Sequence, residues 1–392
     1  MKKGWPTKTL GQLCQLISGQ HIEAKDYNTE SRGVGYLTGP SDFGPLNPVI
    51  SKWTEHPKVK AKCGDVLITV KGSGVGKINL LDQDEVAISR QLMAVRVTGA
   101  DSRFVHAILS STFDHFQSLS TGAAIPGISR EQVLGLKIAL PPLPEQQRIV
   151  GILDEAFEGL ATATANAEKN LHNARALFES HLQSVFTQRG KGWVEKTLGD
   201  VCEFENGDRG KNYPNRHEYV QSGIPWINTG HIQPDGTLSM KEMNFITREK
   251  FDSLRSGKIQ TGDLVYCLRG ATLGKTAFVD PLTEGAVASS LVIVRPSSLL
   301  DSKFLYFFLT SPFGQGLIKG FENGAAQPNL GARSVAKYPI PIPPAVDQRR
   351  IAERLMDLRQ ETKRLESIYQ QKLAALDELK KSLLHQAFAG QL

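Results

Sequence analysis

The chain of 392 residues contains one set of motifs twice, in the same order. Residues 5–14 (WPTKTLGQLC) have a counterpart at 193–202 (WVEKTLGDVC). The remaining matched pairs are 64–67 with 262–265, 72–77 with 270–275, 104–113 with 304–313, 122–126 with 324–328, and 141–149 with 343–351. A repeat of this kind predicts two copies of one fold, because a kept order over six blocks does not arise by chance.

The matched positions are mostly glycine, proline and apolar residues, which fix turns and cores. Between them the copies differ freely; residues 43–62 and 207–243 share little. We therefore expect two related binding modules that share a scaffold and have different targets, at residues 1–144 and 191–344.

Each module combines short apolar runs with short helical patterns, and is therefore predicted to be a mixed α+β domain. The runs that read as strands are 66–70, 92–97, 264–267 and 291–294, and the helical patterns are 104–109 and 304–309.

A long helix is predicted after each module, at 145–190 and 345–392. Residues 145–188 and 347–389 contain no proline, and Pro144 and Asp347 mark their starts. About 43 residues at 1.5 Å each give a length of roughly 64 Å. The fold class is thus two tandem α+β modules separated by two long antiparallel helices that form a coiled coil, with pseudo-two-fold symmetry.

A heptad repeat supports pairing of the two helices, although two helices of an ordinary bundle are the alternative. Several seam positions of the first helix are alanine where the second has leucine, which permits close approach. The large residues assigned to the coiled coil and to partner contacts are Leu153, Leu160, Leu177, Leu355, Leu358, Leu365, Tyr369, Leu376, Leu379 and Leu383.

The net charge of +6 is compatible with a polyanionic partner without requiring one. Residues 1–144 carry a net +4 and residues 191–344 a net +2, so the chain alone should bind DNA weakly. No signal sequence or membrane span is recognisable, and the four cysteines lack the spacing of a zinc site. We expect a soluble, cytoplasmic protein.

The glycine-rich segment 71–77 (KGSGVGK) does not meet the requirements of a phosphate-binding loop. Lys71 stands where that motif needs glycine, and Ile78 where it needs serine or threonine. A tight turn between two strands is the expected structure, one that could still approach a DNA backbone. Metalloprotease, hydrolase and amino-methyltransferase motifs are absent, and a nuclease site at Asp235, Glu249 and Lys250 is only a minor alternative.

With these motifs the sequence resembles the specificity subunit of type I restriction-modification enzymes. The most specific of them is the repeated Pro-Pro-x-x-Glu/Asp-Gln-x-Arg-Ile at each helix start. The resemblance implies that each module reads one half of a split site in double-stranded DNA. It also implies that the helices set the spacer and dock two modification (methyltransferase) subunits, and that separate restriction/translocase subunits cut DNA. No catalysis and no cofactor is expected in this chain; S-adenosylmethionine belongs to the partners.

We expect an asymmetric bipartite target, because the two modules differ, with half-sites about one DNA turn (roughly 34 Å) apart. The rivals are a protein-interaction scaffold without DNA and an enzyme with an unrecognised site. Polar loop residues are the candidate DNA contacts, although each could be solvated surface. They are Lys25, Arg32, Lys71, Ser73, Lys77, Arg90, Gln91, Arg130, Arg209, Lys211, Asn212, Arg216, Asn228, Arg269, Thr272, Lys275 and Arg333, beside the glycine-rich loops 121–129 and 323–330.

Overall fold

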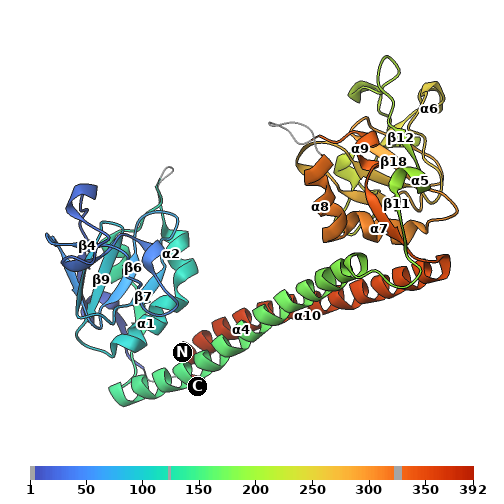
Figure 1. Cartoon of the computed structure of the whole chain (residues 1–392). Helices are drawn as coiled ribbons and strands as arrows, with labels where there is room; N and C mark the ends of the chain where they lie inside the picture. Colours follow the sequence, from blue (N-terminus) through green and yellow to red (C-terminus); the bar gives the residue numbers. More distant parts are fainter. Residues whose placement is uncertain (1–4, 122–124, 322–328) are drawn as a thin grey trace. The chain divides into compact units, whose positions relative to one another are not determined.

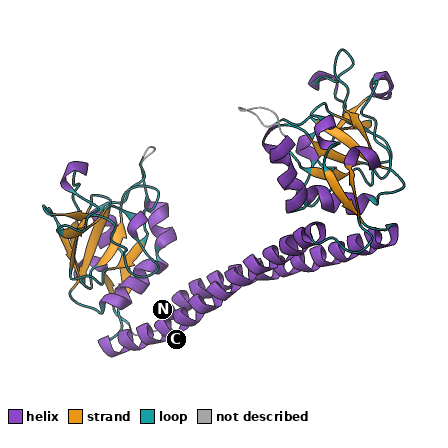
Figure 2. Ribbon diagram, viewed as in Figure 1, coloured by secondary structure: helices purple, strands orange, loops and turns teal. Residues whose placement is uncertain are grey.

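The computed structural model describes residues 5–121, 125–321 and 329–392, which form two compact units (Figures 1 and 2). Unit 1 comprises Met1–Glu168 with Gln371–Leu392, and unit 2 comprises Lys169–Gln370. Each unit therefore combines one globular module with half of each long helix.

The module of unit 1 is built on two four-stranded sheets and a short two-stranded ribbon. The first sheet has the order β2 (Cys14–Ser18), β9 (Leu92–Val97), β6 (Val66–Thr69) and β7 (Ile78–Leu80). The second has the order β4 (Trp53–Thr54), β3 (Val34–Leu37), β8 (Glu85–Ile88) and β5 (Lys60–Lys62). The ribbon pairs β1 (Thr7–Thr9) with β10 (Lys137–Ala139), and the helices are α1 (Ser102–Ser111), α2 (Phe113–Leu119) and α3 (Arg130–Leu134).

The module of unit 2 repeats this plan with one strand fewer in its second sheet. Its first sheet has the order β12 (Cys202–Asn206), β18 (Leu291–Pro296), β15 (Leu264–Cys267) and β16 (Thr276–Phe278). Its second has the order β14 (Asn244–Ile246), β13 (Ile224–Ile227) and β17 (Ala286–Val287), and its ribbon pairs β11 (Val194–Thr197) with β19 (Pro339–Ile342). Its helices are α5 (Leu198–Val201), α6 (Arg248–Ser253), α7 (Ser302–Thr310), α8 (Pro312–Phe321) and α9 (Ala332–Val335).

The shared strand order confirms that the sequence repeat is a structural repeat. In both modules the first sheet is antiparallel throughout, and its central pair aligns Val66 with Val95 and Leu264 with Val294. The second sheet contains one parallel pair in each module, β3 with β8 and β13 with β17. The mixed α+β class expected for the modules is therefore correct.

The two long helices are α4 (Leu143–Thr187) and α10 (Ala345–Ala389), each of 45 residues. They pack antiparallel. In unit 1, Arg148 donates to the carbonyl oxygen of Leu392 at 2.7 Å, and Lys380 Nζ lies 5.4 Å from the ring centre of Phe157. In unit 2, Arg175 Nε lies 2.9 Å from Glu366 Oε2. Within the described ranges no helix is both long and apolar enough to span a membrane.

The heptad repeat predicts two sets of seam positions, with the second set three residues after the first. The structure differs from this expectation by one residue in the second set. In the first set, Ala167, Ala174, Leu355 and Thr362 are buried as expected. The second set lies four residues after the first instead of three, and its half-buried or buried members are Phe157, Thr164, Leu171 and Phe178 on α4, and Glu366, Leu373 and Ala387 on α10.

Three leucines assigned to the seam therefore lie outside it. Leu177, Leu365 and Leu379 are 54%, 37% and 47% exposed. The sequence expectation favoured leucine at these positions, whereas one α10 seam position carries the charged side chain of Glu366, which pairs with Arg175 of α4.

Aromatic side chains fasten the C-terminal end of each helix to a module. In unit 2, Phe186 of α4 is 1% exposed and packs between Phe304 and Phe308 of α7, with ring centres 5.3 and 5.6 Å away. In unit 1, Phe388 of α10 packs on Phe104 of α1 at 5.7 Å. Each long helix thus follows one module in the sequence and ends in the core of the other.

Candidate nucleic-acid interface

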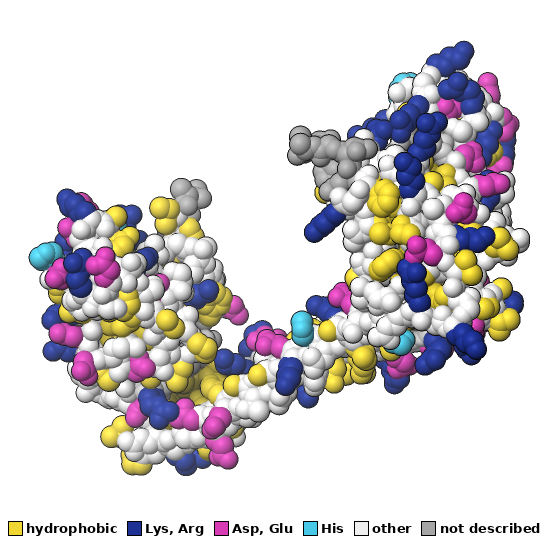
Figure 3. Space-filling model, viewed as in Figure 1, with side chains coloured by type: hydrophobic (Ala, Val, Ile, Leu, Met, Phe, Trp, Pro, Cys, Tyr) yellow, Lys and Arg dark blue, Asp and Glu magenta, His cyan; other side chains and the backbone are white. Residues whose placement is uncertain are grey.

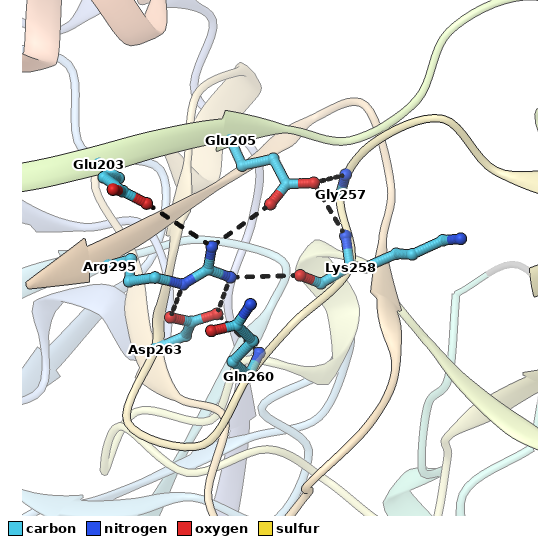
Figure 4. Close-up of polar contacts among 7 residues, drawn as sticks. All are labelled: Glu203, Glu205, Gly257, Lys258, Gln260, Asp263 and Arg295. Atoms are coloured by element: carbon cyan, nitrogen blue, oxygen red, sulfur yellow. Dashed lines mark hydrogen bonds and ion pairs between the residues drawn. The ribbon is translucent and has the colours of Figure 1, made fainter.

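The repeated Gly-Asp motif before the glycine turn builds a buried ion pair in each module. In unit 1, Arg96 donates to both carboxylate oxygens of Asp65, at 3.0 and 2.7 Å. In unit 2, Arg295 donates to both oxygens of Asp263 at 2.8 Å, as Figure 4 shows. The hydrogen bond to the carboxylate raises the pKa of each arginine. Bidentate arginine–carboxylate pairs of this kind orient the central strands, so both arginines have a structural role within their module.

The glycine turns themselves are strand–turn–strand elements, as expected, since β6 pairs antiparallel with β7 and β15 with β16. Gly76 and Gly274 have φ angles of 83° and 82°. A Cβ at Gly274 would lie 2.6 Å from Ile318 Cδ1 of α8, and one at Gly76 would lie 3.0 Å from Phe116 Cβ of α2. Glycine is needed because the turn packs tightly against the following helix.

The buried glutamine of the helix-start motif ties each long helix to its own module. Gln146 accepts a hydrogen bond from the Asp101 amide at 2.8 Å and donates to the Pro141 carbonyl at 2.8 Å. Gln348 accepts from the Asp301 amide at 2.8 Å and donates to the Pro343 carbonyl at 3.0 Å. Both glutamines are 2% exposed. The glutamine therefore gives the repeated motif a structural role: it fixes the angle at which the helix leaves the module.

Several of the candidate DNA contacts are held by their own module. Arg130 donates to Ser18 Oγ at 2.6 Å and to the Leu16 carbonyl at 2.8 Å. Asn212 donates to the Ser253 carbonyl at 2.7 Å. A further set serves local turns or ion pairs: Asn228 caps Gly230, Thr272 Oγ1 lies 3.2 Å from Cys267 Sγ, Lys25 pairs with Glu23, and Arg32 pairs with Glu30.

The remaining candidates are exposed at the surface. They are Lys71, Ser73, Lys77, Arg90 and Gln91 in the first module, and Arg209, Lys211, Arg216, Arg269, Lys275 and Arg333 in the second. Lys275 lines a cavity together with Phe178 and Arg359, on the side of the module that faces the long helices in unit 2. Lysine and arginine side chains lie on both modules among acidic ones (Figure 3). Parts of the glycine-rich loops 121–129 and 323–330 lie outside the described residues.

One cleft of unit 2 brings basic side chains together. Arg209, Arg255 and Arg269 line it with Asn206 and Asn329, and it encloses about 620 Å³. Arg209 and Arg269 were expected to contact DNA. Arg255 carries no signal in the sequence, because only the fold brings it beside Asp208, 47 residues earlier in the chain.

The residues weighed as a nuclease site are occupied otherwise. Asp235 accepts hydrogen bonds from the hydroxyl and the amide of Thr237, and Lys250 donates to Glu218 at 2.6 Å. Among the side chains that the structure describes, no group of three or more His, Cys, Asp or Glu is placed to hold a metal ion.

Comparison with known proteins identifies the family. The type I restriction modification DNA specificity domain matches residues 2–171 and again 190–374. The MjaVIII specificity subunit of Methanocaldococcus jannaschii is 21% identical over 99% of this chain and 93% of its own length. The EcoDI specificity subunit of Escherichia coli is 20% identical over 99% of this chain and 88% of its own.

Solved structures share the fold. A chain from a structure of the type I R-M system, described for its complex assembly and conformational transition, has a TM-score of 0.79 at 20% identity and covers 100% of this chain and 99% of its own. The HsdS subunit of Thermoanaerobacter tengcongensis has a TM-score of 0.62 at 20% identity, with 100% and 98% covered. The chain thus belongs to the type I restriction-modification DNA specificity family, which its repeated architecture and helix-start motifs indicate independently.

Proposed function

We propose that this chain is the subunit that gives a type I restriction-modification complex its DNA sequence specificity, and that each module reads one half of an asymmetric bipartite target. The observation that carries the proposal is the repeat: one scaffold occurs twice, with different side chains at corresponding surface positions. Lys71 in the first module stands where the second has Arg269, just before the glycine turn. Two readers with different donors suit two different half-sites.

The long helices suit the role of a spacer. Each is a single helix of 45 residues, which corresponds to about 68 Å at 1.5 Å per residue. The seam between them is closed by small buried side chains such as Ala167 and Ala174. Paired helices of this length suit a spacer, and we infer that they set the gap between the half-sites.

The same helices suit docking of partner subunits. Leu177, Leu365, Ile368 and Leu379 project exposed apolar surface from them. Apolar side chains in such numbers on a helix surface favour contact with another protein. We propose that two modification (methyltransferase) subunits bind there and supply S-adenosylmethionine and catalysis, that restriction/translocase subunits join the complex, and that this chain performs no chemical step.

The test is a methylation map of the host genome, compared between the wild-type strain and a strain in which this gene is deleted. The proposal predicts methylated adenines in one two-part motif with a gap of fixed length and unlike halves, and their loss in the deletion strain. A continuous or palindromic motif, or a map that the deletion leaves unchanged, would refute it.

A further inference from the structure

Arg255 lies in the cleft of unit 2, where its guanidinium group is both fixed and accessible. Its backbone N–H donates to Asp208 Oδ2 at 2.9 Å, and its Nη2 donates to Asp208 Oδ1 at 3.3 Å and to the Arg209 carbonyl at 2.9 Å. The Asp208 side chain is 2% exposed, whereas that of Arg255 is 70% exposed. The remaining donors, on Nε and Nη1, bond to no described residue of the chain.

The segment that carries Arg255 is clamped to the sheet by a second set of contacts, shown in Figure 4. Glu205 Oε1 accepts hydrogen bonds from the amides of Gly257 at 2.6 Å and Lys258 at 3.3 Å. Arg295, itself fixed by Asp263, donates to the Lys258 carbonyl at 3.3 Å. Gly257 has a φ of 82°, and a Cβ there would lie 2.7 Å from the Cα of Gly207. The loop is therefore ordered before any ligand binds, so little binding free energy is lost in ordering it.

Resting on the function proposed above, we propose that Arg255 reads a guanine in the half-site bound by the second module, and that Arg209 and Arg269 contact the flanking phosphates. Guanine offers two adjacent acceptors, O6 and N7, in the major groove, and arginine is its commonest partner. The three arginines converge on one cleft, so a base edge and the backbone beside it can be engaged together.

The buried carboxylate decides between base and phosphate for Arg255. Hydrogen bonds, chiefly from the Arg255 amide, hold the pKa of Asp208 below its usual range, so Asp208 is ionised at neutral pH. A fixed negative charge beside Arg255 disfavours a phosphate there, while it still orients the guanidinium plane for neutral acceptors. Arg209 and Arg269 form no ion pair with a described acidic residue, which suits them to phosphates.

The first module has a similar contact between a basic side chain and a loop carbonyl, with another donor. Lys58 Nζ donates to the His21 carbonyl at 3.0 Å, as Arg255 does to the Arg209 carbonyl. In the register of the repeat, Lys71 stands in place of Arg269 and His21 in place of Arg209, whereas Pro57, the neighbour of Lys58, stands in place of Arg255. Lysine lacks the planar array of donors, so the two modules should prefer different bases at this position of their half-sites.

The experiment uses the native complex that contains the full chain, with Arg255→Lys and Arg255→Ala variants. The control is Arg248→Ala, an exposed arginine of the same module that pairs with Glu284 away from the cleft. Binding is measured by competition against duplexes that carry every single-base substitution of the mapped target, and against salt concentration. Thermal melting of each variant checks folding.

At one G·C pair of one half-site, we expect the preference of the complex for the target over substituted duplexes to fall about 5- to 150-fold in both Arg255 variants. The salt slope and the other half-site should be unchanged, and Arg248→Ala should read the wild-type target. If Arg255→Ala fails to fold, Arg255→Lys decides, because it keeps the charge and stem.

Three outcomes would overturn the inference: uniform weakening over all sequences with a salt slope lower by about one, which marks a phosphate contact; unchanged discrimination; or a second half-site without guanine. Each of these leaves a bipartite target in place. Failure of the proposed function is different, since the wild-type complex would then show no bipartite target at all.

Discussion

Phe186 attaches α4 to the core of the second module, and Phe186→Ala tests this. The ring is 1% exposed and meets Phe304 and Phe308 at 5.3 and 5.6 Å. Truncation of a buried phenylalanine costs about 3–5 kcal/mol, because apolar burial is lost and a cavity remains. The matched control is Leu177→Ala on the same helix, 54% exposed, which should cost less than about 0.5 kcal/mol.

Hydrogen exchange of the full chain in increasing urea measures this effect in each unit separately. Phe186→Ala should raise exchange in α7 and the sheet of unit 2 and leave α1 of unit 1 unchanged. The corresponding Phe388→Ala should act in unit 1, by about 1–2 kcal/mol, since Phe388 is only half-buried and has a single ring contact, to Phe104 at 5.7 Å. Equal costs for Leu177→Ala and Phe186→Ala would show that Phe186 does not attach α4 to the module.

Three further predictions concern the scaffold. Gln348→Leu should lower the free energy of unfolding of unit 2 by about 2–4 kcal/mol, since buried backbone groups lose their partners; a urea midpoint equal to wild type would contradict this. Gly274→Ala should destabilise by about 1–3 kcal/mol because of its positive φ and the contact with α8, whereas Gly316→Ala, in open space on α8, should be neutral or stabilising in thermal melting. Burial, chiefly, lowers the pKa of His106 to about 4, so the stability that the neutral ring contributes is present above pH 6.5 and is lost as the pH falls toward 4; His106→Gln should flatten the pH dependence of melting between these values.

The repeat allowed the architecture to be predicted from the sequence alone, because glycine, proline and buried polar residues mark the same turns in both copies. Gly76 and Gly274 mark the turns, and Gln146 and Gln348 the helix starts. The helix seam was only half predicted. A search for leucine finds seam positions such as Leu355. It cannot show that Glu366 faces the neighbouring helix, where it forms an ion pair with Arg175.

The candidate site can be predicted less fully than the fold, for a physical reason. Contacts such as Arg255 with Asp208 join residues from different loops, and they leave no spacing pattern in the sequence. Conversely, Arg130 resembles a DNA contact in the sequence yet is bonded to Ser18 and Leu16 of its own module. Exposed charge in a loop is a weak signal until the partners of each group are known.

The placement of Gln371–Leu392 in unit 1 has a consequence for biosynthesis. Leu384 and Ala387, 7% and 0% exposed, complete a core whose other members are translated before residue 154. At about 5–20 residues per second, the ribosome needs roughly 10–50 s to proceed from the end of the first module to these residues. During that interval the core that contains Ile149, Val150 and Leu153 lacks Leu384 and Ala387. The core of the part that is made first is thus completed only when Leu384 and Ala387 are translated.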